Sequence, residues 1–435
     1  MDSKLESNLL EEGTTAPSKT ENDDENCTRE PPDGGFKAWL CVFGAFLLQF
    51  SSFGYVNACG IFQFYYSTSL LKSQSASSLA WITTLQVFLM FFLGPPVGLV
   101  IDAVGPRPVL IPFSILCVVV IFMLSLCTEY WQVMLAQGVA FGIGTAGVSL
   151  PALVLVSQWF SIRRGLATGI VSAGSSCGGI VYPIMVSRLI ERNGFASAVR
   201  WTGLLVGVCL VVGNICISAP FKPKGFEARQ AKNFAAFKSL PCAFFVLGSF
   251  FGVLVLFAPL NYLPEMAAQI GMPLHLIYYT ISIANVGSAF GRIIPGAISD
   301  KFGVFNTLTI VLLLSGVFTL AIWLPLEIHP STAGIFVFGL LYGFVSGGVI
   351  SLAPPCVVAL GDGDVANMGA MMGGLCFSIA LGALTGLPIL GAIKDADGDR
   401  FRNVIAFSGC VLILGGFFIG VARVLKFGGA LKKRA

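Results

Sequence analysis

One arginine, Arg292, stands well inside a long apolar run, IANVGSAFGRIIPG. A charge at membrane depth is costly unless it faces protein or water, so Arg292 is a functional candidate. All twelve carboxylates after residue 33 fall near the ends of apolar runs or between them, so we expect no acid within the runs to pair with it. Its planar fork suits the carboxylate of an incoming organic anion, held by two hydrogen bonds. The alternative is a structural role.

Two asparagines inside apolar runs, Asn57 and Asn285, are predicted to lie near the cavity in which the substrate of Arg292 would bind. Other chemistry is not indicated. The two histidines, His275 and His329, stand near predicted helix ends, and the twelve cysteines show no CxxC or Cys/His spacing, so we expect no metal site. No GxxxxGK[ST] string occurs, which argues against nucleotide binding, and no cofactor is indicated.

A short motif with an acid occurs twice, as GLVIDAVGPR (Gly98–Arg107) and GAISDKFGVF (Gly296–Phe305). Glycines let two helices approach closely, and an acid at a helix end can pair with a base or with the N-terminus of a neighbouring helix. Asp102 and Asp300 are therefore predicted to form a latch that opens when the molecule changes shape. The bases assigned to the same gating region are Arg107, Arg163, Arg164 and Lys301.

The elements that carry these residues must be membrane helices. The chain has 435 residues, of which 55% are hydrophobic and only 11% are charged. Apolar runs of about 20 residues, the length that crosses a bilayer, recur nearly end to end. Twelve spans are predicted: Trp39–Phe62, Leu79–Ile101, Val109–Leu126, Trp131–Trp159, Gly165–Ile190, Trp201–Ala219, Leu240–Tyr262, Leu276–Ile298, Thr307–Leu324, Ala333–Leu360, Ala366–Ile393 and Val404–Leu425. The fold class is an all-α polytopic membrane protein.

The two halves of the chain repeat each other. The paired motifs above lie 198 residues apart, glycines of span four recur 201 residues later in span ten, and glycines of span five recur 200 residues later in span eleven. This near-constant offset predicts two homologous six-helix bundles, residues 34–220 and 240–426, facing each other as in transporters built from parallel repeats.

Charge predicts the remaining segments and the orientation. Residues 1–33 carry a net charge of −7 and are expected to be a disordered tail, while 221–239 form a basic linker and 427–435 a basic tail. With both termini cytoplasmic, 14 Lys and Arg residues lie inside and seven outside, as the positive-inside rule requires. Membrane topology thus explains the positive net charge of the chain after residue 33 better than nucleic-acid binding does. A plasma-membrane location is expected, with the lipid bilayer as partner.

These motifs resemble known ones. The duplicated acid motif and the twelve-span plan resemble the major facilitator superfamily over residues 34–426. Asp33, Gly34, Gly35 and Phe36, directly before span one, resemble the entry motif of its monocarboxylate-porter-like family. The string WFSIRRGLATGIVSAG (Trp159–Gly174) resembles that family's second motif, and the acidic tail is similar to the fungal branch.

The resemblance implies a substrate role for Arg292 but not simple proton–lactate symport. Proton-coupled members carry an Asp one turn before this Arg and a Lys on the first span, where this chain has Ser288 and Asn57. Ser288 is therefore predicted, with Arg292, Asn57 and Asn285, to bind substrate. We therefore expect a secondary active or facilitative transporter of a small organic anion, working by alternating access. The alternative is efflux of a fungal secondary metabolite. A non-transporting nutrient sensor is less favoured, since only ten residues follow Leu425, and an enzyme is not expected.

Overall fold

The computed structural model describes residues 33–160, 162–220, 239–361, 365–398 and 400–428. The predicted acidic tail up to residue 32, almost all of the basic linker and most of the basic tail lie outside these ranges, as does the side chain of Asp102. The described part is helical and contains twelve helical stretches long and apolar enough to cross a membrane, which confirms the predicted fold class.

Six spans make up the first half, here called the N-half. They are built from α1 (Phe36–Ser51), α2 (Phe53–Val56), α3 (Cys59–Tyr65) and η2 (Tyr66–Leu70); α4 (Ala76–Phe92) and α5 (Gly94–Val104); α6 (Arg107–Leu124); α7 (Tyr130–Val133), η3 (Met134–Ala140) and α8 (Phe141–Trp159); α9 (Arg164–Asn193); and α10 (Phe195–Cys216).

The other six spans make up the C-half. They are built from α11 (Leu240–Leu256) and α12 (Ala258–Gln269); α13 (Leu274–Phe302); α14 (Val304–Phe318), η5 (Thr319–Trp323) and α15 (Leu324–Ile328); α16 (Thr332–Leu360); α17 (Val365–Ala396); and α18 (Arg402–Phe427). The first and seventh spans are both broken near their middle, at Ser52–Ala58 and at Phe257.

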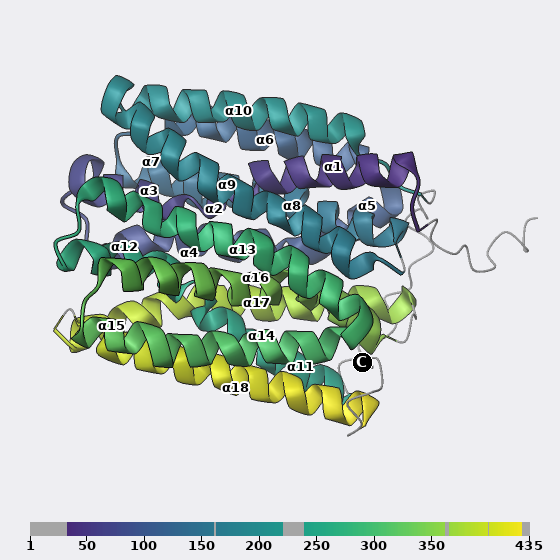
Figure 1. Cartoon of the computed structure of the whole chain (residues 1–435). Helices are drawn as coiled ribbons and strands as arrows, with labels where there is room; N and C mark the ends of the chain where they lie inside the picture. The colour runs from purple at the N-terminus through teal and green to yellow at the C-terminus, as the bar shows by residue number, and fades with distance from the viewer. Residues whose placement is uncertain (1–32, 161, 221–238, 362–364, 399, 429–435) are drawn as a thin grey trace, which may run out of the picture.

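Each half packs around its own apolar core. One cluster of buried residues is drawn almost wholly from the N-half, and a second is drawn from the C-half. The N-half, purple to teal, and the C-half, green to yellow, lie side by side in Figure 1. Outward positions such as Ile115, Ile215 and Phe417 are apolar yet 58%, 70% and 60% exposed, as expected of side chains that face lipid.

The helices all run roughly along one axis, so the molecule has two ends. At one of them α1 begins, α9 begins and α18 ends (Figure 1). We call it the basic end, because Arg107, Arg163, Arg164 and Lys301 lie there, and we call the other the opposite end.

The two halves meet chiefly through α9 against α13 and α4 against α17. Along α9 and α13 the contacts run antiparallel, from Gly165 beside Gly296 to Gly179 beside Asn285. A Cβ atom placed on Gly165 would stand 2.5 Å from the carbonyl oxygen of Gly296, so only glycine allows these backbones to come so close.

The duplicated motif ends a helix in both halves. Gly105 follows α5 with φ 91°, and Gly303 follows α13 with φ 98°. Such positive φ values suit glycine at a helix C-terminus. The predicted spans matched these helices to within a few residues at most ends. Spans one and seven extend seven or eight residues further, to Leu70 and Gln269, and span six begins six residues earlier, at Phe195.

Candidate functional site

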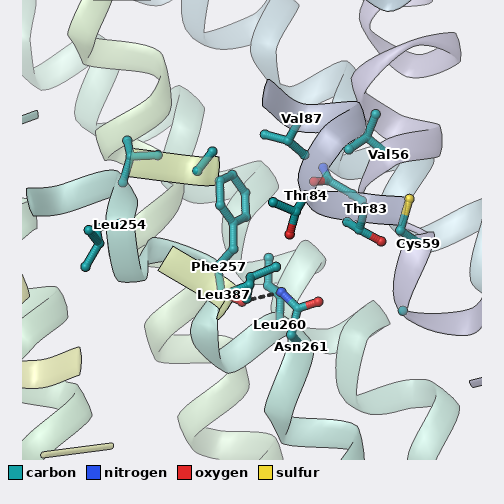
Figure 2. Close-up of a pocket in the computed structure, with 14 residues that line it drawn as sticks. Val56, Cys59, Thr83, Thr84, Val87, Leu254, Phe257, Leu260, Asn261 and Leu387 are labelled. Atoms are coloured by element: carbon teal, nitrogen blue, oxygen red, sulfur yellow. Dashed lines mark hydrogen bonds between the residues drawn. The ribbon is translucent and has the colours of Figure 1, made fainter. Parts of the chain in front are cut away.

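A cavity lies where the two halves meet. Its N-half wall comes from the broken first span and from α4, and its polar members are Asn57, Cys59, Thr83 and Thr84. Its C-half wall comes from the seventh span and α17, through Leu254, Phe257, Leu260, Asn261, Ala383 and Leu387. Figure 2 shows the Thr84 and Cys59 side of the cavity across from Leu254, Phe257 and Leu260. The predicted residue Asn57 thus lies in this wall.

The N-half wall of the cavity is more polar than the C-half wall, and neither wall carries a formal charge on its described residues. Apart from Asn261, the C-half wall is entirely apolar. The amide nitrogen of Asn261 donates to the carbonyl oxygen of Phe257 at 2.8 Å, and that of Asn57 donates to the carbonyl of Ser175 at 3.2 Å. Space for water-sized molecules amounts to about 50 Å³. Pockets for drug-sized ligands measure roughly 300–1,000 Å³, so this conformation is a contracted one.

Thr84 leaves a hydroxyl unbonded in the cavity wall. Its side chain is 1% exposed, and its Oγ1 atom has no hydrogen-bond partner among the described residues. An unbonded buried hydroxyl costs about 1–3 kcal/mol. Other buried threonines avoid this cost, since Thr168 and Thr202 donate to carbonyl oxygens four residues earlier.

Arg292 lies behind this cavity, between α13 and α9. It is 2% exposed, and its guanidinium donates to the carbonyl of Ser172 at 2.7 Å, to Oγ of Ser175 and to Oγ of Ser288 at 3.2 Å. Among the described residues no carboxylate lies within ion-pair distance of it. Neutral oxygens of α9 and of α13 itself already accept its hydrogen bonds, so the fork that was expected to hold an anion is occupied in this conformation.

Aromatic rings separate Arg292 from the cavity. The guanidinium lies over the ring of Phe53, 5.8 Å from its centre, and that ring contacts Phe257 edge to face at 6.5 Å. Of Arg292, Phe53 and Phe257, only Phe257 is part of the cavity wall. The other predicted substrate residues are on α13 with Arg292: Asn285 donates to the carbonyl of Ile281 at 3.0 Å, and Ser288 accepts from Ser176 at 3.1 Å. Neither lines the cavity described above.

At the basic end, an acid of one half binds a helix N-terminus of the other. The carboxylate of Asp300 accepts the backbone N–H groups of Gly165 at 2.9 Å and Leu166 at 3.2 Å, in the first turn of α9. The N-terminal turn of a helix has unpaired N–H groups and partial positive charge, so it favours an anion. This contact closes the two halves together at the basic end.

The two family-like motifs touch each other at the same place. Asp33 has φ 51°, its backbone N–H donates to the carbonyl of Trp159 at 3.0 Å, and its carboxylate accepts the N–H of Ile162 at 2.8 Å. Gly34 and Gly35 follow with φ 156° and 93°, and lead to the exposed ring of Phe36. These contacts tie the chain before α1 to the turn that precedes α9.

The remaining gating candidates are less engaged. The Nε of Arg164 donates to the carbonyl of Phe160 at 3.0 Å, beside the backbone groups that Asp33 and Asp300 bind. Arg107, Arg163 and Lys301 are exposed at the basic end. The structure therefore brings Asp33, Arg164 and Asp300 together around the start of α9. For Asp102 the backbone is part of α5, and its side chain lies outside the described residues.

Two buried cations escaped the sequence analysis. Lys394, expected in an outside loop, lies within α17 at 8% exposure and forms an ion pair with Glu265 of α12, whose side chain is 47% exposed. Arg423 of α18 is 5% exposed and donates to the amide oxygen of Asn306 at 2.8 Å. Lysine and arginine close to a span end look like loop charges in a hydropathy profile, so only the packed helices reveal such pairs.

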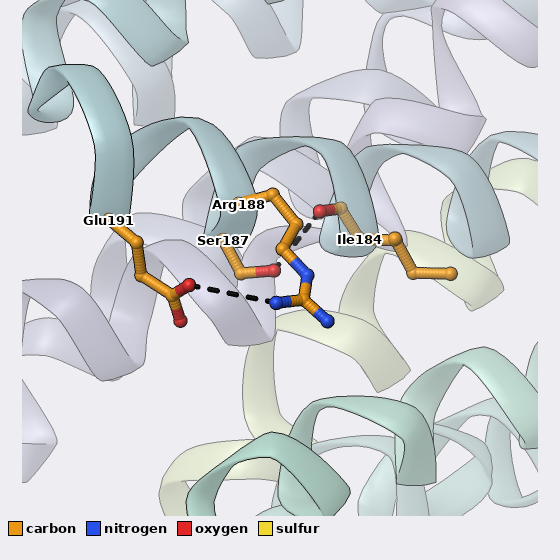
Figure 3. Close-up of polar contacts among 4 residues, drawn as sticks. All are labelled: Ile184, Ser187, Arg188 and Glu191. Carbon is orange, nitrogen blue, oxygen red and sulfur yellow. Dashed lines mark hydrogen bonds and ion pairs between the residues drawn. The ribbon is translucent and has the colours of Figure 1, made fainter.

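An ordinary surface pair provides the contrast. Arg188 and Glu191, one turn apart on α9, lie 3.9 Å from each other with side chains 60% and 57% exposed (Figure 3).

Among the described residues no cluster of three or more His, Cys, Asp or Glu side chains could hold a metal ion.

Comparisons with known proteins agree with this architecture. The family described as Major Facilitator Superfamily matches residues 39–383. The chain is 58% identical over 419 residues to the MFS-type transporter hasB of Aspergillus fumigatus, with 93% of each chain covered. It is 36% identical to the Fujikurins efflux protein of Gibberella fujikuroi, covering 91% of this chain and 84% of the relative. It is also 36% identical to the Aspyridones efflux protein apdF of Emericella nidulans, covering 92% and 80%.

Proposed function

Since this chain belongs to the Major Facilitator Superfamily of membrane transporters, we propose that it exports a fungal secondary metabolite by alternating access. The observation that carries the proposal is the cavity between the halves, whose walls come from both of them and carry no charge on their described residues. The printed names of two relatives describe efflux of fujikurins and of aspyridones, which supports export rather than uptake of a monocarboxylate.

The cycle follows from the contacts across the halves. In this conformation the basic end is closed by Asp300 on the start of α9 and by glycine contacts between α9 and α13. Opening requires that these contacts break while each half keeps its own core. A metabolite would then enter from the basic end, and closure of that end would precede release at the opposite one. The moving units are residues 34–220 and 240–426.

We place the basic end in the cytoplasm and the chain in the plasma membrane. The excess of Lys and Arg at that end supports the orientation, because positively charged loops stay on the cytoplasmic side. We assign the chain to the fungal branch of the monocarboxylate-porter-like family: the contact of Asp33 with the turn before α9 joins the two motifs that resemble that family, and the similar proteins are fungal.

Disruption of the gene in a fungus that carries it tests export. We expect one group of compounds to fall in the medium and rise in the cells, measured by mass spectrometry of both fractions. Reintroduced wild-type gene should restore the profile, whereas a Gly296→Ala gene should not, because the added methyl group blocks closure of the basic end. An unchanged profile in medium and cells would contradict the proposal.

A second candidate function is transport of a small organic anion bound by Arg292. The observation that favours it is a buried guanidinium bonded to neutral oxygens alone among the described residues. We expect Arg292→Lys to remove such transport, because Lys keeps the charge and loses the planar fork. Uptake of radiolabelled pyruvate by yeast cells that express the chain measures this. Equal uptake with and without the chain would remove the candidate.

A further inference from the structure

The cavity offers a ligand one buried group that lacks a partner. Thr84 is 1% exposed, lines the cavity from α4, and has no partner for its hydroxyl among the described residues. Figure 2 shows this hydroxyl directed away from α4, toward Leu260 and Asn261. The buried hydroxyls of Thr168 and Thr202, by contrast, are bonded to backbone carbonyls of their own helices.

The neighbouring polar groups are already engaged. The thiol of Cys59 donates to Oε1 of Gln86 at 3.2 Å and accepts from Nε2 of Gln137 at 3.6 Å. The amide nitrogens of Asn57 and Asn261 donate to backbone carbonyls, which leaves their oxygens as acceptors. Of the residues that line the cavity, Thr84 is the one with a fully buried polar side-chain atom that has no hydrogen-bond partner among the described residues.

The rest of the surroundings is apolar and uncharged. Leu254, Phe257, Leu260 and Leu387 face Thr84 from the C-half, and the ring of Phe53 covers the guanidinium of Arg292. A carboxylate entering here would lose its water and gain no cation, which is strongly unfavourable. An uncharged group such as an amide, ketone or hydroxyl would gain a hydrogen bond.

We propose that Thr84 is a specificity-determining residue, which selects an uncharged ligand with a hydrogen-bonding group on an apolar body. The inference rests on the proposed export function and specifies its substrate class. The polar group of the ligand bonds the Thr84 hydroxyl, and its apolar body packs against the C-half wall.

Binding of two matched probes tests the proposal without transport. The probes are 2-naphthamide, which is uncharged, and 2-naphthoate, which carries a carboxylate on the same rings. Both are measured by equilibrium dialysis against the full chain in lipid nanodiscs, with empty nanodiscs subtracted. For a ligand of this size we expect the amide to bind with a Kd of about 1 mM and the carboxylate at least about fivefold more weakly.

Variants then locate the hydrogen bond. Thr84→Val keeps the shape and removes the hydroxyl, so it should weaken amide binding about fivefold, the effect of one neutral hydrogen bond. Thr84→Ser restores the hydroxyl and should restore binding. Thr202→Val, which removes a bonded hydroxyl far from the cavity, serves as the matched control and should leave binding unchanged.

Any one of three results would overturn the proposal. The carboxylate could bind more tightly than the amide, Thr84→Val and Thr202→Val could weaken amide binding equally, or the amide could show no binding beyond that of empty nanodiscs. Because no transport is measured, such a failure is distinct from failure of the export proposal, which rests on the composition of the culture medium.

Discussion

At the scale of single residues, the buried cations are stabilised in different ways. The guanidinium groups of Arg292 and Arg423 donate to neutral oxygens, whereas the ammonium group of Lys394 pairs with the carboxylate of Glu265. A buried charge is tolerated when its donors are satisfied, and removing a single charged partner is costly. The site of Lys394 therefore responds differently to loss of the acid and loss of the base.

We predict that Glu265→Gln destabilises the protein by about 1–2 kcal/mol, and more than Lys394→Met does, because it removes the ion pair while the ammonium group stays buried. The range is modest because the Glu265 side chain is 47% exposed and partly screened by solvent. Equilibrium unfolding in sodium dodecyl sulfate measures both. The double variant should recover stability. Arg188→Gln, at the exposed pair on α9, is the control and should change less than about 0.5 kcal/mol.

A second prediction concerns Asp300. Asp300→Asn removes the negative charge from the start of α9 while keeping one acceptor, so closure of the basic end should weaken by about 1 kcal/mol, or roughly fivefold in the equilibrium. Spin labels at the exposed positions Ile111 and Leu425 should report a larger population with the basic end open. Asp395→Asn, an exposed acid at the opposite end, should leave the distance distribution unchanged. If both substitutions gave the wild-type distribution, the latch would be wrongly assigned.

At the scale of elements, the positions of the helices could be predicted from the sequence, whereas the contacts between side chains of different helices could not. Hydropathy runs are local in sequence, so they located all twelve spans found in the described residues, whereas the sequence analysis did not predict that Gly105 and Gly303 end α5 and α13. The partners of a buried side chain belong to other helices. The bonds from Arg292 to α9 and the unbonded Thr84 hydroxyl therefore emerge only when the helices are packed.

We predict that Gly296→Ala disfavours the closed basic end by about 1–3 kcal/mol, because its methyl group would stand 2.5 Å from the carbonyl oxygen of Gly165. The same spin-label distances measure the effect. In the control Gly207→Ala, the nearest atom to the added carbon is 3.6 Å away, an ordinary contact. A wild-type distribution for Gly296→Ala would show that the helices can separate without losing closure.

At the scale of the whole molecule, an even number of spans brings the start of α1 and the end of α18 to the same end, the basic end. Two separate apolar cores allow the halves to rotate against each other without unfolding either one. In the proposed cycle, the contacts that change would thus be those on the surface between the halves.

We predict that epitope tags at both ends of the chain are protected from protease in intact cells and are cut after the membrane is permeabilised. The excess of basic residues at that end is the physical reason. A tag inserted after Gly194, between α9 and α10 at the opposite end, is the control and should be cut in intact cells. Cleavage of the terminal tags before permeabilisation would show that the chain has the opposite orientation.

The division into two cores also bears on how such a chain can evolve. Each half keeps its own apolar core, so in the proposed cycle substitutions in the facing walls are expected to alter what is carried with little effect on either core. Natural selection can therefore explore new cargoes at little risk to folding. Two relatives that are each 36% identical to this chain are named for different compounds, fujikurins and aspyridones, which is the diversity of cargo expected of such a scaffold.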